Sequence, residues 1–440
     1  TPIDTVKFAA AYGTWIKEQR SKESYRVVIG RDARISGAMI QNLVMNTLIG
    51  MGIDVIDLDL STTPTVEIAV PLEHADGGII LTASHNPKQW NALKLLDHNG
   101  EFLNSEHSQR VLDIAAADSM EFAGVDDLGA ITKNQAYFDI HIDAVLDLEH
   151  VNVKAIAACK FKVVVDAVNS TGGIAIPLLL ERLGVEAVKL HCEPNGHFPH
   201  NPEPLKEHLT DLSEKVVASA ADFGIAVDPD VDRLAFMDEK GVMFGEEYTL
   251  VACADYILSH KPGNTVSNLS STRALRDVTE KYGGTYTASA VGEVNVVNAM
   301  KASNASIGGE GNGGIIYPES HYGRDALVGV ALFLSLLAER KIAVSTLRAS
   351  YPSYFMSKKK IDLNPTIDVD AILVAMETRY SQEQISTIDG VKIDFPTEWV
   401  HLRKSNTEPI IRIYTEAPTQ GTADKLADKI INEIKEVAGL

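Results

Sequence analysis

Three aspartates near the middle of the chain carry the strongest chemical signal in the sequence. In DPDVDRLAF, Asp228, Asp230 and Asp232 alternate directly after the apolar residues 224–227. Carboxylates this close repel one another unless a cation lies between them, and a set of carboxylate ligands suits a hard ion such as Mg²⁺. The alternative is an acidic turn exposed to solvent, which the apolar sequence on both sides disfavours. The spacing therefore predicts a divalent-cation site.

An EF-hand calcium loop is the obvious competing interpretation of this segment. Glu239 occupies the twelfth position counted from Asp228, where such a loop carries its last ligand. The sixth position is Arg233, however, where the loop requires glycine, and the flanking residues favour strands rather than helices. We therefore reject the EF-hand.

A serine that could act as a nucleophile follows a second apolar stretch. Ser84 enters a turn that the following Asn-Pro dipeptide prevents from continuing as a helix or a strand. His85 is adjacent and Lys94 lies ten residues further on. A hydroxyl, an acid/base candidate and a cation thus share one segment, although a plain Ser/Asn/Pro turn is the alternative. The G-x-S-x-G pattern of α/β-hydrolases is absent here.

Two further polar segments are suited to binding a phosphorylated sugar. In GGEGNGG (residues 308–314), five glycines let the backbone approach a ligand, while Glu310 and Asn312 offer acceptors and donors to hydroxyl groups. The alternative is a flexible surface loop. Near the C-terminus, RKSNTEPIIRIY favours a phosphate clamp over rim arginines of a surface loop, because arginine binds phosphate in bidentate fashion. Its candidate residues are Arg403, Ser405, Asn406, Thr407 and Arg412.

The composition limits which partners such sites could serve. The chain has 440 residues, with 40 Lys plus Arg against 60 Asp plus Glu and a formal net charge of −20. A field of that sign repels nucleic acids and anionic membranes, so we expect neither as a partner. No apolar run approaches the ~18 residues that span a bilayer, and three cysteines without paired spacing are typical of a reducing compartment. We expect a cytoplasmic globular protein.

A segment rich in histidine and proline, HCEPNGHFPHNPEP, resembles a metal site only superficially. Its spacing of His191, Cys192, His197 and His200 matches no zinc pattern, and its prolines stiffen the backbone. We expect an ordered turn between domains.

The elements that must position these residues alternate between short β-branched strands and amphipathic helices, which favours α/β units with largely parallel sheets. A strand followed by a turn and a helix recurs from Val27, Val163 and Thr265, and each recurrence is followed by one of the polar loops. We therefore expect three related α/β domains that present loops at the carboxyl ends of strands, where open α/β sheets bind ligands. A final segment from about Ser357 forms a smaller α+β domain. The predicted helices cover residues 2–19, 37–50, 176–183, 325–340 and 423–437.

The motifs TASHNP, DPDVDR, GEGNGG and RKSNTEP, in this order and approximate spacing, resemble those of the α-D-phosphohexomutase family. That family includes phosphoglucomutase/phosphomannomutase and phosphoglucosamine mutase, and the resemblance covers essentially the whole chain. It implies three α/β domains and a smaller fourth domain around a central cleft. The implied domains are residues 1–135 with the serine, 136–242 with the metal loop, 243–356 with the sugar loop and 357–440 with the phosphate loop.

The resemblance also implies a role for each motif. Ser84 would be a phosphoserine and, with the three aspartates, a ligand of Mg²⁺. His85 and Lys94 match proposed acid/base groups, with Arg233 nearby. The remaining residues would bind the phosphosugar: Glu310 and Asn312 its hydroxyls, and Arg403, Ser405, Asn406, Thr407 and Arg412 the phosphate that does not react.

The implied reaction converts hexose 1-phosphate to hexose 6-phosphate through a hexose 1,6-bisphosphate that reorients. The form GEGNGG resembles archaeal-type members, among which glucose, mannose and glucosamine phosphates are all used, so the sugar stays open. Two departures stand out. The chain starts after the point where the family carries a strand and an SGIRG-like turn, so that segment is missing or activity is impaired. Gly314 also replaces a histidine of many bacterial relatives, so proton transfer must rest on other groups.

Two other functions compete with a mutase. A Mg²⁺-dependent sugar phosphatase could use the same serine, but it would not need a second, distant phosphate clamp. A sugar-phosphate-binding protein without turnover is disfavoured by the complete set of serine, aspartates and arginine. We expect a monomer or a homodimer.

Overall fold

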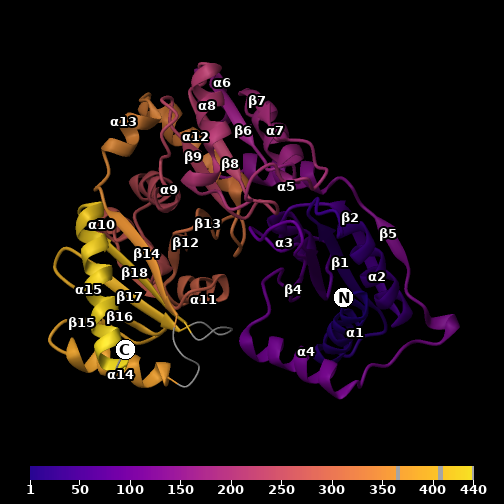
Figure 1. Ribbon diagram of the computed structural model, residues 1–440. Helices are drawn as coiled ribbons and strands as arrows, with labels where there is room; N and C mark the ends of the chain where they lie inside the picture. The colour runs from indigo at the N-terminus through magenta and orange to yellow at the C-terminus, as the bar shows by residue number, and fades with distance from the viewer. Residues whose placement is uncertain (363–366, 405–409, 439–440) are drawn as a thin grey trace. The chain divides into compact units, whose positions relative to one another are not determined.

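The computed structural model describes residues 1–362, 367–404 and 410–438. The chain forms two compact units (Figure 1). The first comprises residues 1–257 and 312–347, and the second comprises residues 258–311 and 348–440. Each unit is therefore built from two separate stretches of the chain.

The first sheet of the first unit has the strand order β4-β3-β1-β2-β5, with β4 antiparallel and the other strands parallel. Alternate residues of β1 face opposite layers: Val27 and Ile29 pack under helices α1, α2 and α4, whereas Val28 packs under α3 and α5. The elements are α1 (Pro2–Gln19), β1 (Tyr25–Arg31), α2 (Gly37–Gly50), β2 (Ile53–Leu60), α3 (Thr63–Leu72), β3 (Gly77–Leu81), β4 (Leu93–Leu96), α4 (Ser105–Ala117), β5 (Ile131–Lys133) and α5 (Tyr137–Leu146).

The second sheet repeats the order of the first, as β7-β6-β8-β9 with β9 antiparallel. Helix α8 covers one face of this sheet, and α12 presents Phe333 to Phe236 of β9, with the two rings stacked 3.8 Å apart. Every residue of α12 from Ala326 to Ala338 is buried. The elements are α6 (Val153–Cys159), β6 (Lys162–Asp166), α7 (Gly172–Arg182), β7 (Glu186–Leu190), α8 (Thr210–Ala218), β8 (Phe223–Val227), β9 (Leu234–Met237), β13 (Gly314–Ile316) and α12 (Ala326–Arg340).

The second unit contains three parallel strands in the order β11-β10-β12, which again places the first strand between the next two. The unit also contains an antiparallel sheet of order β14-β18-β17-β16-β15, and helices α14 and α15 cover one face of that sheet. The elements are β10 (Asn264–Asn268), α10 (Ala274–Lys281), β11 (Tyr286–Ser289), α11 (Glu293–Ser303), β12 (Ala305–Glu310), β14 (Phe355–Asp362), α14 (Val369–Arg379), β15 (Gln384–Ser386), β16 (Val391–Asp394), β17 (Trp399–Lys404), β18 (Ile410–Ala417) and α15 (Gln420–Ala438).

This architecture confirms the predicted fold class: α/β repeats with mainly parallel mixed sheets, followed by an α+β segment. The predicted bounds of α1 and α2 agree with the structure, and α1 begins with a capping box formed by Thr1 and Asp4. Helix α7 begins at Gly172, four residues before the prediction. The other α-helices in the described residues are α9 (Glu246–His260) and the short α13 (Val344–Ala349). No helix within the described residues is both long and apolar enough to cross a bilayer.

Candidate active site

The serine segment leaves the sheet at the carboxyl end of β3. Ser84 has a φ of 47°, in the left-handed region that non-glycine residues rarely adopt. Its backbone N–H donates to Thr82 Oγ1 at 2.9 Å, and its carbonyl accepts from Arg34 Nη2 at 2.5 Å. The residue is therefore held from both sides in a strained conformation, a feature typical of functional sites.

The three aspartates leave the second sheet in the same way, directly after β8. All three are fully buried. Asp228 Oδ1 accepts from the backbone N–H groups of Asp232 and Arg233 at 3.2 and 3.1 Å. Between the aspartates, Val231 has a φ of 64°, which is unusual for a β-branched residue. The backbone thus curls around the first carboxylate of the loop.

The structure brings the serine and the aspartates together across 144 positions of sequence. Ser84 Oγ donates to Asp228 Oδ2 at 3.0 Å. On the far side of the loop, Thr63 Oγ1 donates to Asp230 Oδ2 at 2.6 Å, and Thr63 N donates to Asp230 O at 2.9 Å. Thr63 lies on α3 and was not singled out from the sequence, because a threonine at the start of a helix is common.

The donor set of this loop fits a divalent cation. One carboxylate oxygen from each aspartate lies within 4.8 Å of the others. Asp230 Oδ1 and Asp232 Oδ1 are buried without a hydrogen-bond partner, which leaves two carboxylate oxygens available to a metal. Burial, together with the charges of Asp232 and Asp230, raises the pKa of the Asp228 carboxyl well above its usual value. A bound cation would relieve this repulsion.

Two cations from other segments flank the aspartates. Lys94 Nζ lies 2.7 Å from Asp230 Oδ2 and 3.2 Å from Asp232 Oδ2, and Arg324 Nη2 lies 2.8 Å from Asp232 Oδ2. Against the effect of burial, Arg324 and then Lys94 hold the pKa of Asp232 below its usual range. Burial lowers the pKa of Lys94, but the charges of Asp230 and Asp232 outweigh this effect and raise it above its usual value. Lys94 is therefore a fixed positive charge in this state.

Arg324 went unnoticed in the sequence, and Gly314 is the residue that makes room for it. A Cβ atom at position 314 would overlap Cδ of Arg324, and Asn312 Oδ1 lies near the same point. The absence of a side chain at position 314 thus leaves room for the stem of Arg324.

His85 lies beside the serine, and Arg233 directly follows the last of the three aspartates. His85 Nδ1 is 3.4 Å from Ser84 Oγ, and burial together with Arg233 lowers the pKa of His85. Arg233 forms an ion pair with Glu203 at 3.3 Å. His85 is therefore suited to accept a proton near the serine oxygen at neutral pH.

Glu310 and Asn312 fall into different units. Glu310 lies at the end of β12 and is 4% exposed. Its Oε1 accepts from Asn268 Nδ2 at 2.8 Å and from Gly292 N at 3.2 Å. In the first unit, Asn312 Oδ1 accepts from Gly314 N at 3.2 Å. Within the second unit, Glu310 is thus held rigidly by neighbouring loops.

The C-terminal sheet gathers positive charge on the face that its helices do not cover. Arg403 of β17 lies directly opposite Arg412 of β18, and Lys360 of β14 lies opposite Arg412 from the other side. Like charges in register repel one another, so a row of three cations favours binding of an anion. Arg403 is partly neutralised by Asp389 at 2.7 Å. Ser405, Asn406 and Thr407 lie outside the described residues.

The fold and this serine–aspartate–cation arrangement define a class of phosphoryl-transfer enzymes, and comparison with known proteins names the family. Four segments match the phosphoglucomutase/phosphomannomutase family: alpha/beta/alpha domain I over residues 1–121, domain II over 139–241, domain III over 245–354 and the C-terminal domain over 357–433. The chain belongs to this family, whose members are phosphohexomutases, isomerases that act by phosphoryl transfer. The resemblance inferred from the motifs is thereby confirmed.

Similar proteins carry several names within the family. A phosphoglucomutase/phosphomannomutase of Thermococcus kodakarensis is 35% identical over 438 residues, covering 99% of this chain and 95% of the relative. A probable phosphoglucosamine mutase of Methanopyrus kandleri is 32% identical, covering 93% and 90%. A solved phosphoglucomutase/phosphomannomutase family protein of Burkholderia thailandensis has a TM-score of 0.86 at 24% identity, covering 99% and 94%, and shows the same fold.

Proposed function

We propose that this enzyme interconverts hexose 1-phosphate and hexose 6-phosphate through a phosphoserine at Ser84 and a hexose 1,6-bisphosphate. The observation that carries the proposal is the 3.0 Å contact between Ser84 Oγ and Asp228 Oδ2, in a site flanked by Lys94 and Arg324. A hydroxyl beside clustered carboxylates and fixed cations is suited to phosphoryl transfer, which depends on positioning and charge neutralisation.

We propose that Asp228, Asp230 and Asp232, together with an oxygen of the serine group, hold Mg²⁺. The two carboxylate oxygens without hydrogen-bond partners support this ligand set. When bound, the ion would neutralise charge on the transferring phosphoryl group and polarise its oxygens.

In the forward transfer, the bond between Ser84 Oγ and phosphorus breaks while a bond forms between phosphorus and a free hydroxyl oxygen of the sugar. We propose that the proton of that hydroxyl passes to His85, whose Nδ1 lies 3.4 Å from Ser84 Oγ, and from there to the serine oxygen that leaves phosphorus. Lys94 and Arg324 remain charged and support the negative charge that develops. The reverse transfer, after the bisphosphate has reoriented, returns a phosphoryl group to Ser84 and a proton to the sugar oxygen.

We propose that the segments at residues 310–312 and 403–412 bind the substrate. Glu310 and Asn312 are proposed to bind the sugar hydroxyls. The row formed by Lys360, Arg412 and Arg403 supports binding of the phosphate that does not react, together with the clamp residues Ser405, Asn406 and Thr407. We propose a hexose of the glucose, mannose or glucosamine series, with the 1,6-bisphosphate as activator. A phosphatase would not need this second anion site.

Phosphorus NMR tests the proposal directly. The enzyme is incubated with Mg²⁺, a trace of glucose 1,6-bisphosphate and, in separate tubes, the 1-phosphates of glucose, mannose and glucosamine. Growth of a 6-phosphate resonance supports the mutase, and the relative rates rank the sugars. Growth of inorganic phosphate alone supports the phosphatase. Ser84→Ala must abolish the signal, whereas Ser108→Ala, which removes only a hydroxyl bonded to Leu103 O elsewhere in the unit, must not.

A further inference from the structure

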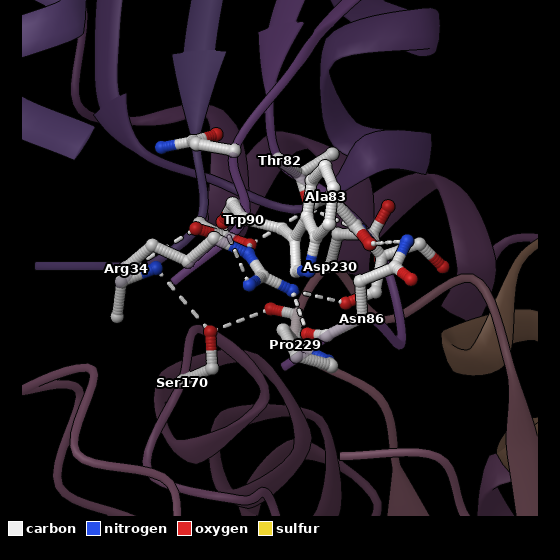
Figure 2. A network of polar contacts seen from close by, with 12 residues as sticks. Arg34, Thr82, Ala83, Asn86, Trp90, Ser170, Pro229 and Asp230 are labelled. Atoms are coloured by element: carbon white, nitrogen blue, oxygen red, sulfur yellow. Dashed lines mark hydrogen bonds and ion pairs between the residues drawn. The ribbon is translucent and has the colours of Figure 1, made fainter. Parts of the chain in front are cut away.

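Arg34 lies outside the motifs, and its guanidinium makes hydrogen bonds to the serine loop and to Asp32. Arg34 is 1% exposed, and Figure 2 shows its guanidinium surrounded by backbone oxygens. Its Nε donates to Asp32 Oδ2 at 2.9 Å. Its four other donors bind four carbonyls: Ser84 at 2.5 Å, Asn86 at 2.7 Å, Pro87 at 2.8 Å and Trp90 at 3.0 Å. Because a guanidinium has five N–H donors, none is left for any other partner.

These bonds replace the regular structure that the loop lacks. Residues 84–90 run between β3 and β4 without forming a helix or a strand, so their carbonyls must find other donors. The partner of Arg34 also acts on Ser84 from the opposite side, since Asp32 Oδ2 accepts from Thr82 Oγ1 at 2.7 Å and Thr82 Oγ1 accepts the N–H of Ser84. Asp32 and Arg34 thus fix both backbone groups of the serine.

The same short segment is tied to the aspartate loop. The backbone N–H of Ala33 donates to Ser170 Oγ at 3.2 Å, and Ser170 Oγ donates to the carbonyl of Pro229 at 2.6 Å (Figure 2). Pro229 lies between the first two aspartates. Residues 32–34 therefore contact the serine loop through side chains and are linked to the aspartate loop through Ser170.

The proline-rich segment 191–204 covers this arrangement. The ring of Phe198 lies 5.1 Å from Arg34 Cζ, and Gly196, with a φ of 73°, approaches so closely that a Cβ there would overlap the carbonyl oxygen of Ala33. Its histidines bind carboxylates of their own, His200 with Asp166 at 3.1 Å and His191 with Asp211 at 3.1 Å. The segment thus packs against Arg34 and Ala33.

We propose that Arg34 is a positioning residue that sets the place of Ser84 Oγ relative to the aspartate loop. The inference rests on the proposed function of Ser84. A lysine cannot replace the arginine, because its single ammonium has three donors and no planar fork to serve four carbonyls and a carboxylate. Without the guanidinium, Ser84 is still present, but its loop loses the hydrogen bonds that hold it in the observed conformation.

The test compares Arg34→Lys with the wild type in two measurements. The kcat of the mutase reaction should fall about 100-fold, as expected for a displacement of about 1 Å at a reacting group, with KM nearly unchanged. Hydrogen exchange followed by mass spectrometry should show amides of residues 82–92 exchanging about tenfold faster or more, the factor for one lost charge-assisted hydrogen bond. Amides of residues 228–234 should keep their wild-type rates.

A matched control and a chemical rescue separate positioning from general destabilisation. Arg340→Lys weakens the ion pair of Arg340 with the fully buried Asp255, 2.5 Å apart in the same unit. It should lower the melting temperature comparably while leaving kcat within about twofold, because surrounding packing is retained. Added guanidinium should restore part of the kcat of Arg34→Ala, and methylammonium should not.

An unchanged kcat in Arg34→Lys, or unchanged exchange at residues 82–92, overturns the inference. An equal loss of kcat in Arg340→Lys does so too, because the effect would then be general. If the wild type itself lacks mutase activity, the proposed function fails, but the exchange measurement still decides whether Arg34 orders the serine loop.

Discussion

Replacing Gly314 with alanine should displace the guanidinium of Arg324 from Asp232. The added Cβ would overlap Cδ of Arg324, so the arginine stem must swing away and its guanidinium must leave Asp232 Oδ2, now 2.8 Å from Nη2. Arg324 is 8% exposed, so water cannot fully replace the lost partner. A charge-assisted hydrogen bond contributes about 1.5–3 kcal/mol, which corresponds to a fall in kcat/KM of about 10- to 150-fold.

The assay is steady-state mutase turnover at saturating Mg²⁺, with a double-mutant cycle to identify the cause. If Gly314→Ala acts through Arg324, adding it to Arg324→Ala should cost almost nothing more, because the interaction is already absent. Gly421→Ala is the matched control, since a Cβ there meets no atom within 4 Å. Full additivity of the two substitutions, or wild-type activity in Gly314→Ala, would refute the reasoning.

Three further predictions concern the serine, the phosphate clamp and the aspartate loop. Ser84→Ala should abolish turnover while sugar-phosphate affinity, measured by calorimetry, stays within about tenfold, because the hydroxyl is needed for transfer rather than binding; retained turnover would contradict this. Arg412→Ala should weaken substrate binding by ~1.5–3 kcal/mol, and Lys360→Ala by less, since Arg412 lies between the two other cations of the row whereas Lys360 lies at its end; equal affinities for all three proteins would remove this strand face from the clamp. Asp228→Asn should weaken Mg²⁺ binding more than about tenfold and yet raise the melting temperature in EDTA, because it deletes one of three buried, mutually repelling carboxylates. Since burial and its neighbours raise the pKa of Asp228, the folded state holds that proton more tightly, and the metal-free wild type should lose stability as the pH rises above the ordinary carboxyl range. A pH series of melting curves in EDTA should show this loss in the wild type and a smaller one in Asp228→Asn.

The sequence predicted the features that depend on local pattern. Thr1 followed by Pro2 marked the start of α1, and the recurrence of strand, turn and helix predicted related α/β units with mainly parallel strands. Asp228, Asp230 and Asp232 could be read as one site because they are close in sequence and follow a buried strand. Their approach to Ser84, which follows a strand of a different sheet, was implied only by the resemblance to the phosphohexomutase family.

The residues that sequence analysis missed act only through tertiary contacts. Arg34 lies in the loop before α2 and Thr63 begins α3, and nothing local indicates that one holds four carbonyls and the other binds Asp230. Arg324 could have been suspected only from the space that Gly314 leaves, which requires coordinates. Lys360 joins Arg412 through strand register, which three consecutive lysines do not reveal.

The interrupted first unit imposes an order of events on biosynthesis. Phe236 of β9 stacks on Phe333 of α12, but the ribosome adds Phe333 97 positions later. At about 5–20 residues per second, this delay lasts roughly 5 to 20 s. During that interval the nascent chain makes residues 258–311 of the second unit while the aromatic face of the first unit is still without its covering helix. The growing polypeptide must therefore keep this face from aggregating until α12 has been made, and we expect slow translation through this stretch to lower the yield of folded enzyme.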